Sequence, residues 1–435
     1  MRNRRTRRNK RNHNIKTLRI IIMVLIIFVL IAFIKNLYDK NNKESLQVNT
    51  ADISQLNETQ NNEQEENIIN EIDTQSTVTE DQPKTSPDIT FTMAITGDIM
   101  AHNTVYNDAL NSSKSSYDFS HMFEDIKFYL QTADITIGNL ETTFAGSKVG
   151  YSSYPTFNTP EALARNLKKV GFDVLSTANN HSLDKGFNGI KSTINYLDDA
   201  DISHTGTYKS KEDSEKILIK NVKGVSIAFL SFTYGTNGIP VPEDKEFCIN
   251  LIDKKEILKQ LKLAKEQNPD MICVSMHWGT EYQTKPNSTQ KELADFLFKN
   301  GVDIILGNHP HVLQPMEKRT IKLDDGTSKE CFVIYSLGNF LADQTYTYTR
   351  DSAILKLQIT KDGETNKISI DSATYTPTYI YKNTSKSKKK FKILDVESTI
   401  ERYKAGYDTS IGKTTYNTLV TELKNIKKLI GKEIK

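Results

Sequence analysis

Two histidines with one residue between them offer the clearest chemistry in this sequence. They are His309 and His311, and they follow the apolar run of residues 302–306. That run is typical of a buried parallel strand, so the pair is expected at the carboxyl end of a strand, where open α/β sheets bind their ligands. Pro310 restricts the backbone between them. Neutral imidazole commonly binds zinc, manganese or iron, and two polar loop residues are the alternative interpretation.

Four further predicted strands end in polar side chains that could join the same site. These strands cover residues 91–96, 135–137, 174–178 and 271–276. Together with the histidine pair, their ends supply the candidate metal ligands Asp98, Glu141, Asn180, His277, His309 and His311. Such ligands suit one or two divalent ions of manganese, zinc or iron, and two adjacent ions would clamp a phosphoryl oxygen and activate a water. Taken singly, each residue also has a structural explanation, such as a turn cap or a core histidine.

Several neighbouring residues are candidates for a supporting role. Asp184 follows His181 by three residues and could orient its imidazole, with an Asx turn as the alternative. Trp278 and Glu281 follow the strand of residues 271–276, and Glu281 could orient a ligand, bind substrate or face water. Asn339 follows another predicted strand, so we expect it to line the same cleft.

The segments between these candidate ligands alternate between strand and helix. Helices are predicted over residues 122–132, 159–170, 252–266 and 289–298, and further strands over residues 224–232, 332–335 and 354–359. Because strands and helices alternate along the chain, the sequence predicts an α/β fold with polar residues gathered at strand ends.

The first 88 residues predict a membrane anchor and a tether. Residues 1–17 form a basic tail, and residues 18–38 would span about 31 Å as a helix, enough to cross the hydrocarbon core of a bilayer. Residues 1–38 carry ten basic residues and no acid, so the N-terminus is expected in the cytoplasm and the rest of the chain outside the cell membrane, as a single-pass protein. A cleavable signal peptide is the alternative. Residues 39–88 carry twelve acids and no aromatic residue, which predicts a disordered acidic linker.

The remainder of the chain is close to charge balance. It carries 44 basic and 42 acidic residues, so a dedicated nucleic-acid binder is not expected. The three cysteines show no disulfide pattern and are predicted to be free thiols. Residues 381–435 are predicted to form a C-terminal extension with a lysine-rich loop at 382–392 and an amphipathic helix that packs on the domain.

Six short motifs occur in order along the chain. They are Gly97-Asp98-Ile99-Met100, Asn139-Leu140-Glu141, Ala178-Asn179-Asn180-His181-Ser182-Leu183-Asp184-x-Gly186, His277-Trp278-Gly279-x-Glu281, His309-Pro310-His311-Val312-Leu313-Gln314-Pro315 and Tyr335-Ser336-Leu337-Gly338-Asn339-Phe340. Over residues 91–345 the chain therefore resembles the CapA family of bacterial poly-γ-glutamate capsule synthesis proteins. This family is similar to the calcineurin-like metallophosphoesterases, which implies a four-layer α-β-β-α sandwich for a domain over residues 89–380.

The resemblance also implies roles for the residues of the first two motifs. Metallophosphoesterases begin with D-x-H. Here Asp98 matches the aspartate, whereas Met100 stands in place of the histidine and His102 is a candidate substitute. Glu141 takes the place of the bridging aspartate, with Asn139 beside it as a substrate-binding or supporting residue.

The later motifs match more closely. Asn180 and His181 match the G-N-H motif, which implies a metal ligand and, with Asp184 beside it, the catalytic acid that protonates the leaving group. The remaining ligand histidines of the superfamily are matched by His277, His309 and His311. Because Met100 lacks a ligand nitrogen, the resemblance leaves open whether two ions bind and whether phosphatase activity persists.

Three functions fit these features. The first is a membrane-anchored extracellular protein of capsule or cell-envelope polymer synthesis or export, with a metal-dependent hydrolase or transferase site. The second is a non-catalytic subunit that binds an anionic polymer such as poly-γ-glutamate beside other membrane subunits of a synthase. The third is a secreted metal-dependent phosphodiesterase or phosphatase. The sequence therefore leaves open the choice between an enzyme and a binding subunit.

Overall fold

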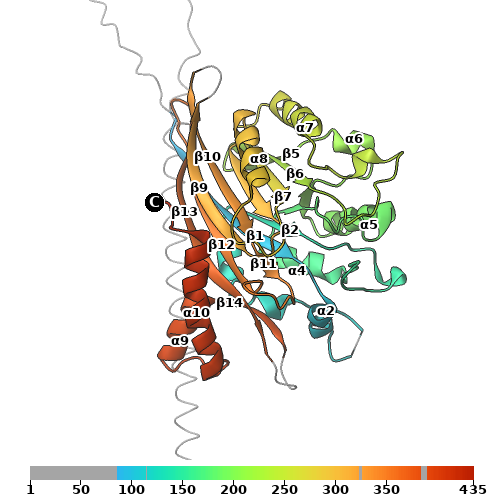
Figure 1. Ribbon diagram of the computed structural model, residues 1–435, viewed down its shortest axis with the longest axis vertical. Helices are drawn as coiled ribbons and strands as arrows, with labels where there is room; N and C mark the ends of the chain where they lie inside the picture. The colour runs from blue at the N-terminus through green and yellow to red at the C-terminus, as the bar shows by residue number, and fades with distance from the viewer. Residues whose placement is uncertain (1–85, 114, 323–325, 384–388) are drawn as a thin grey trace, which may run out of the picture. The chain divides into compact units, whose positions relative to one another are not determined.

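The computed structural model describes residues 86–435, apart from residues 114, 323–325 and 384–388 (Figure 1). The predicted basic tail, the predicted anchor at residues 18–38 and nearly all of the predicted linker lie outside the described residues. Within the described part of the chain, no helix is both long enough and apolar enough to cross a membrane.

The first sheet carries the N-terminal strands of the domain. Among the described residues it contains eight strands in the order β14-β13-β12-β1-β2-β3-β4, with β11 paired to β1. Their bounds are β1 Ile89–Ile99, β2 Ile135–Leu140, β3 Val174–Ser176, β4 Ser203–Thr205, β11 Asn339–Leu341, β12 Asp351–Lys361, β13 Ile368–Lys382 and β14 Phe391–Asp395. Strands β1 to β4 run parallel, so their carboxyl ends share one edge of the sheet.

The second sheet contains six strands within the described residues, in the order β5-β6-β7-β8-β10-β9. Their bounds are β5 Leu218–Val222, β6 Val225–Thr233, β7 Met271–His277, β8 Ile304–Asn308, β9 Leu313–Lys322 and β10 Ser328–Leu337. Strands β6, β7, β8 and β10 run parallel, whereas β5 and β9 are antiparallel edge strands. A second set of strand ends therefore lies along one edge.

Helices cover the outer faces of the two sheets (Figure 1). On the first sheet lie α2 Asn103–Ala109, α3 Lys127–Gln131 and α4 Ala162–Val170, and on the second lie α7 Lys254–Glu266 and α8 Ser288–Lys299. Helix α5, Gly186–Asp199, follows β3 and packs with Ala178 and Leu183 in a smaller cluster.

Alternating side chains along the strands explain the layers. Phe91 and Met93 of β1 share one buried cluster with Ile227 of β6, and this cluster fills the space between the sheets. Ala94 lies between Met93 and Ile95 in the chain, and both of these belong to that cluster. Ala94 belongs instead to the cluster beneath helices α3 and α4. Successive side chains of a strand point to opposite faces, so each sheet is buried on both sides. The predicted α/β class is confirmed, with helix, sheet, sheet and helix following one another.

The predicted C-terminal extension is continuous with the domain. It supplies β14, which pairs with β13, and the helices α9 Val396–Lys404 and α10 Lys413–Ile430. Leu419, Ile426 and Ile430 of α10 are buried in the cluster that also lies between the sheets, so the apolar face of this helix packs on the domain as predicted. The side chains of Lys382, Lys389 and Lys392 in the lysine-rich loop contact acidic groups or carbonyls. Examples are Lys382 with Asp343 and Lys392 with Asp125.

One predicted helix is interrupted. Residues 122–132 contain a 3₁₀ turn over Ser120–Phe123 and the short helix α3, rather than one continuous helix. Phe123, Ile126 and Leu130 are all buried, so the apolar periodicity was a correct guide to burial. Asp125, between the two pieces, pairs with Lys392 at 2.7 Å, and this contact from β14 accompanies the break.

Candidate metal centre

The carboxyl ends of strands from both sheets converge on one buried cluster of ligand side chains. Asp98 lies near the end of β1 and Glu141 follows β2 in the first sheet. From the second sheet, His277 ends β7, and His309 and His311 follow β8. All five side chains are buried, and each residue exposes at most 4% of its surface. The packing of sheet against sheet therefore brings together residues that are far apart in the chain.

The ligand atoms of these residues are close enough to share ions. Within the described residues, three groups have ligand atoms that all lie within 4.8 Å of one another: Glu141, His277 and His309; Asp98, Glu141 and His311; and Glu281, His309 and His311. Glu141 belongs to the first two groups, so it lies between two candidate ion positions.

The Glu141 carboxylate has no hydrogen-bond partner at either oxygen, although it is fully buried. Its Oε1 lies 3.6 Å from Nε2 of His277 and 3.8 Å from Nε2 of His311. Burial and the nearby Asp98 carboxylate raise the pKa of Glu141 well above its usual value. Burying a carboxylate without donors costs several kcal/mol unless a cation lies beside it, so this donor set fits a metal ion.

The imidazoles are held in the form that binds metals. Burial lowers the pKa of His277 well below its usual value, and burial together with His311 lowers the pKa of His309 to about 3. Both rings are therefore neutral at physiological pH, as metal ligation requires. The Nδ1 atom of His309 is also buried without a hydrogen-bond partner. The ring of Tyr234 lies beside both, with its centroid 4.5 Å from that of His309 and 6.3 Å from that of His277.

The backbone of the histidine pair adopts a conformation that is unusual for L-residues. His309 has φ of 96° and His311 has φ of 59°. Such left-handed conformations are rare outside glycine and concentrate at functional sites. The backbone N–H of His309 donates to Oδ2 of Asp98 over 3.3 Å, which contributes to holding the loop. Before this loop, a Cβ on Gly307 would lie 2.0 Å from the backbone oxygen of Tyr335, so only glycine allows β8 to approach β10 this closely.

Asparagine side chains hold the ligands in place. Nδ2 of Asn139 donates to Oδ1 of Asp98 over 2.8 Å, and Ser176 donates to Oδ1 of Asn139 over 2.9 Å. Oδ1 of Asn339 lies 3.0 Å from Nδ1 of His311, which is also 3.2 Å from Oδ2 of Asp98. Outer partners of this kind fix the orientation of ligands and tune their basicity.

The segment after β3 adds an amide ligand and a hydrogen-bonded histidine. Oδ1 of Asn180 lies 2.9 Å from Nε2 of His277, which places this amide oxygen at the cluster. Nδ1 of His181 lies 2.8 Å from Oδ2 of Asp184, and the same oxygen accepts the backbone N–H of Phe157 over 2.6 Å. The Phe157 ring meets the His181 ring edge-on, with centroids 4.7 Å apart. Asp184 thus orients the imidazole, and the predicted Asp184–His181 contact is present.

Other predicted residues lie outside the ligand groups. His102 precedes α2, its Nδ1 accepts the backbone N–H of Asp343 over 3.2 Å, and it joins none of the three groups. Met100 is buried among apolar side chains beneath the helices of the first sheet. Trp278 donates to the backbone oxygen of Tyr335 over 3.0 Å and packs in the outer cluster of the second sheet.

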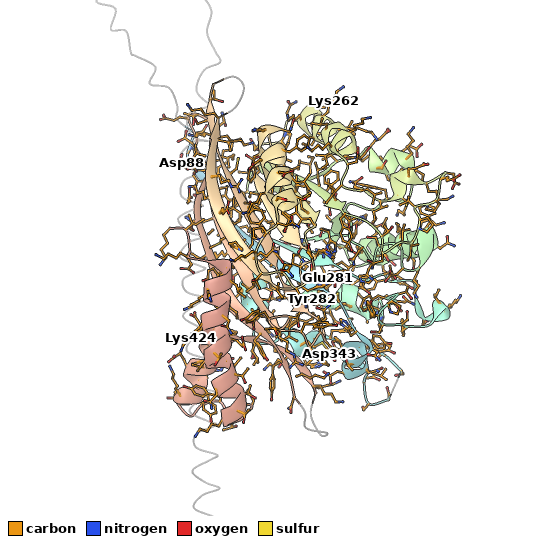
Figure 2. All side chains as sticks on the ribbon, in the orientation of Figure 1. Asp88, Lys262, Glu281, Tyr282, Asp343 and Lys424 are labelled. Carbon is orange, nitrogen blue, oxygen red and sulfur yellow. The ribbon has the colours of Figure 1, made fainter. Side chains whose placement is uncertain are left out.

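The loop after β7 contributes a residue at the solvent side. Glu281 is exposed, yet its carboxylate forms one of the three ligand groups with His309 and His311. Figure 2 labels it together with Tyr282. The Tyr282 ring lies 6.1 Å from the His311 ring and 4.4 Å from that of Tyr346. Glu281 could therefore contact either an ion or a substrate.

Sequence reasoning missed several residues beside the cluster. They are Tyr234 and Asn237 after β6, Tyr282 after β7, and Phe157 in the loop before α4. Asn237 accepts from Nδ2 of Asn180 over 3.1 Å. The signal available for Tyr234 was its place directly after the predicted strand of residues 224–232, the same kind of position that identified the ligands.

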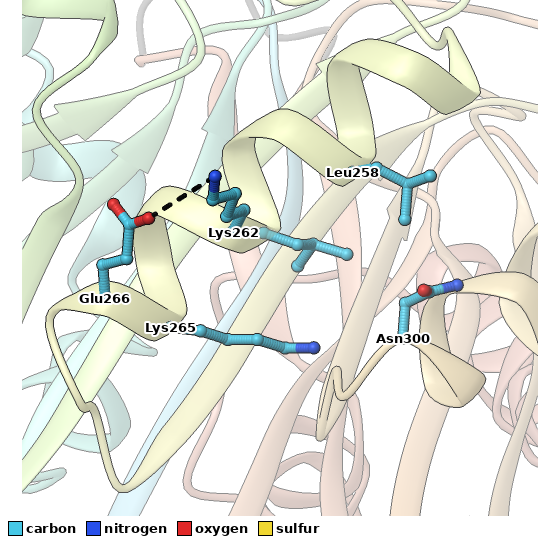
Figure 3. Close-up of a pocket in the computed structure, with 6 residues that line it drawn as sticks. Leu258, Lys262, Lys265, Glu266 and Asn300 are labelled. Carbon is cyan, nitrogen blue, oxygen red and sulfur yellow. Dashed lines mark ion pairs between the residues drawn. The ribbon is translucent and has the colours of Figure 1, made fainter. Parts of the chain in front are cut away.

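A hollow on α7 is separate from this centre (Figure 3). It is lined by Leu258, Lys262, Lys265, Glu266 and Asn300, and Lys262 pairs with Glu266 at 3.9 Å. Figure 2 labels Lys262 far from Glu281, on the outer face of the second sheet. None of the described buried polar atoms without a partner belongs to a lining residue. Chemistry is therefore expected at the strand ends and not here.

Taken together, the fold and the cluster define a two-sheet α/β protein with a buried candidate centre for divalent metal. The chain belongs to the family of the bacterial capsule synthesis protein PGA_cap, whose family model matches residues 92–344. The family resemblance predicted from the motifs is thereby confirmed.

Two named relatives belong to bacilli. The chain is 33% identical over 280 residues to the capsule biosynthesis protein CapA of Bacillus anthracis, covering 63% of this chain and 65% of that protein. It is 31% identical over 311 residues to the PGA biosynthesis protein CapA of Bacillus subtilis (strain 168), covering 68% of this chain and 75% of that protein. Among solved structures, the calcineurin-like phosphoesterase YfkN from Bacillus subtilis aligns at 14% identity with a TM-score of 0.39, covering 79% of this chain and 99% of that chain.

Proposed function

We propose that this protein acts in the synthesis or export of an anionic capsule or cell-envelope polymer, of the poly-γ-glutamate type, through a metal-dependent hydrolase or transferase site. Family membership supports the polymer class, since both bacillus relatives are named for capsule or PGA biosynthesis. The observation that carries the metal-dependent site is the buried Glu141 carboxylate, which faces His277 and His311 without a hydrogen bond at either oxygen.

The proposal includes the position of the protein in the cell. Residues 18–38 anchor it as a single-pass membrane protein, the N-terminus is cytoplasmic, and residues 89–435 lie outside. The basic flank and the apolar run of the sequence support this arrangement. The folded domain on the outer surface would meet the polymer as it leaves the membrane synthase. The other subunits of that synthase are the expected protein partners.

The ion or ions would be held by Asp98, Glu141, Asn180, His277, His309 and His311. A bound manganese, zinc or iron ion polarises a carbonyl or phosphoryl oxygen and lowers the pKa of a bound water. The protein's own groups supply binding and proton transfer. Because Nδ1 of His181 is engaged by Asp184, its Nε2 is the atom that gives or takes a proton, and the Asp184 carboxylate stabilises the resulting imidazolium.

A non-catalytic role is the second candidate, and Met100 is the observation that favours it. Where metallophosphoesterases have the histidine of D-x-H as a ligand, this chain has Met100 and buries its thioether in an apolar cluster. His102 lies outside the three ligand groups, and its Nδ1 accepts a backbone hydrogen bond. In the non-catalytic role, the folded domain would bind polymer for a membrane synthase. The described lysines 382, 389 and 392 are each already engaged by protein groups.

Complementation separates these functions. In a deletion strain of the source bacterium, surface polymer would be measured with the wild-type chain, with Glu141→Gln and with His181→Ala, each checked for cell-surface abundance. We expect both substitutions to abolish polymer formation. Normal polymer with both variants would favour the non-catalytic role. Hydrolysis of a generic bis-aryl phosphate by the purified protein, abolished by chelator, would instead indicate a phosphodiesterase.

A further inference from the structure

A second cavity lies between α10 and the first residue of β12. It has a volume of about 290 Å³ and is lined by Asp351, Glu422, Arg350, Tyr379 and the segment of residues 345–348. Helix α10 supplies Glu422 and lies against β12 and β13 (Figure 1). None of the ligands of the candidate metal centre lines this cavity, so it is a separate place in the fold.

Two carboxylates meet in this cavity. Asp351 exposes only 1% of its surface, and its Oδ2 is buried without a hydrogen-bond partner. Burial and the adjacent Glu422 carboxylate raise the pKa of Asp351 to about 9. Two carboxyl groups this close cannot both remain charged unless a cation lies between them.

The nearest basic side chain does not neutralise the pair. Arg350 lines the cavity, but its guanidinium lies 4.0 Å from Oδ1 of Asp343. The charge that acts on Asp351 is that of Glu422. The cavity therefore contains a buried acceptor and a carboxylate neighbour, together with space that the described side chains do not fill.

We propose that Asp351 and Glu422 bind a hard divalent cation of the calcium or magnesium class in this cavity. Such ions prefer oxygen ligands, and they commonly combine two or more carboxylates with hydroxyls, carbonyls and waters. Thr345, Thr347 and Tyr379 also line the cavity and bring hydroxyl groups. No histidine or cysteine does, which distinguishes this site from the imidazole-rich centre at the strand ends.

The bound cation would join the C-terminal helix to the edge of the candidate metal centre. The segment of residues 345–351 reaches that centre through one hydrogen bond, in which the backbone oxygen of Thr349 accepts from Nδ2 of Asn339 over 2.9 Å. Oδ1 of the same asparagine lies 3.0 Å from Nδ1 of His311. A cation held by Asp351 and Glu422 therefore fixes the segment that positions Asn339, and through it a ligand imidazole.

The test is isothermal titration calorimetry, in which Ca²⁺ or Mg²⁺ is titrated into the chelator-treated full chain at pH 8. We expect one bound Ca²⁺ in the wild type, and the same binding in a His309→Ala/His311→Ala variant, because calcium avoids imidazole ligands. Asp351→Asn and Glu422→Gln should each weaken binding at least about tenfold. Glu401→Gln, which removes an exposed carboxylate from neighbouring α9, should leave it unchanged.

Circular dichroism confirms that each variant is folded, and two isosteric variants keep the test valid if one of them fails to fold. The proposal is overturned if the wild type binds neither ion up to about 10 mM, which is about tenfold above the dissociation constants of the weakest protein calcium sites. In that case the two carboxyl groups simply share a proton. It is also overturned if Asp351→Asn and Glu422→Gln bind calcium like the wild type, or if calcium binding disappears in the double histidine variant.

Discussion

Nε2 of His277 lies 3.6 Å from Oε1 of Glu141, with both side chains buried. The separation exceeds that of a hydrogen bond. Two ligand atoms that each lie about 2.1 Å from one ion are typically between about 3 and 4 Å apart. The pair is therefore arranged as co-ligands, and it joins β7 of the second sheet to the end of β2 in the first.

Replacing Glu141 by glutamine tests this arrangement. The amide keeps the shape but removes the charge and one good ligand oxygen, so we expect the affinity for manganese, zinc or iron to fall at least about tenfold. The metal-free variant should be no less stable than the wild type, because glutamine removes a buried charge that lacks donors. Metal content by mass spectrometry and competition with a chelator measure the effect.

The matched control is Glu364→Gln, at an exposed glutamate in the turn between β12 and β13. It should retain the metal content of the wild type. Equal metal content in the Glu141 variant and in this control would show that Glu141 is not a ligand.

The sequence allowed the strand ends to be found because apolar runs precede the polar residues. Val174–Ser176, Met271–His277 and Ile304–Asn308 are each buried along their whole length, as continuous apolar runs predict for central parallel strands. The same reasoning could not show which ends meet across the two sheets. Tyr234 reaches the cluster only because β6 pairs with β7 in register, with Thr233 beside His277.

Residues that are adjacent in a motif can also lie on opposite faces of a sheet, for a reason that motif spacing does not reveal. His277 ends β7 at the cluster, whereas Trp278, the next residue, packs on the helix-covered face with Tyr335. Side chains of successive residues point to opposite faces, so adjacency in a motif does not imply adjacency in a site. Met100 follows Asp98 by two residues but is buried under helices for a different reason, because β1 is irregular between Asp98 and Ile99 and ends at Ile99. Strands β9 and β13 were not predicted, since both mix polar with apolar residues.

Gly97 is expected to be essential for the fold of the site. A Cβ at this position would lie 1.9 Å from the backbone oxygen of Gly338, the same oxygen that accepts the N–H of Asp98 over 2.9 Å. Gly97→Ala must push β1 away from this segment, and we expect a loss of about 3 kcal/mol or more in the free energy of unfolding. Urea unfolding measures it.

Gly412→Ala provides the comparison, because nothing lies within 4 Å of its added Cβ. As an N-cap substitution it should cost less than about 1 kcal/mol. Similar unfolding curves for the two alanine variants would contradict the close approach of β1 to Gly338.

Asp184→Asn should separate proton transfer from metal binding. The amide keeps the size of the side chain and can still accept the N–H of Phe157, but it no longer stabilises a positive charge on His181. We expect polymer output, or turnover of a phosphodiester substrate, to fall at least about tenfold while metal content and thermal stability stay near those of the wild type. Wild-type output from this variant would show that His181 does not act as an acid.

Asp351 should make stability depend on pH. Burial and Glu422 raise its pKa to about 9, compared with 3.8 for an ordinary aspartate, so the folded state keeps a proton that the unfolded state releases. The contribution of this protonated carboxyl to the free energy of unfolding is fully present below pH 3.8. It is lost progressively as the pH rises towards 9. Asp351→Asn has no such loss. Its stability relative to the wild type should therefore grow by about 2–4 kcal/mol between pH 5 and pH 8.

Chemical denaturation at several pH values, with chelator present to remove divalent cations, measures this difference. Glu401→Gln, at an exposed position on α9, should differ from the wild type by a nearly constant amount over the same range. A constant difference for Asp351→Asn as well would mean that its carboxyl is already ionised in the folded protein. Because the folded carboxyl must lose its proton before a cation can bind, the same experiment also predicts that added Ca²⁺ stabilises the wild type more at pH 8 than at pH 5.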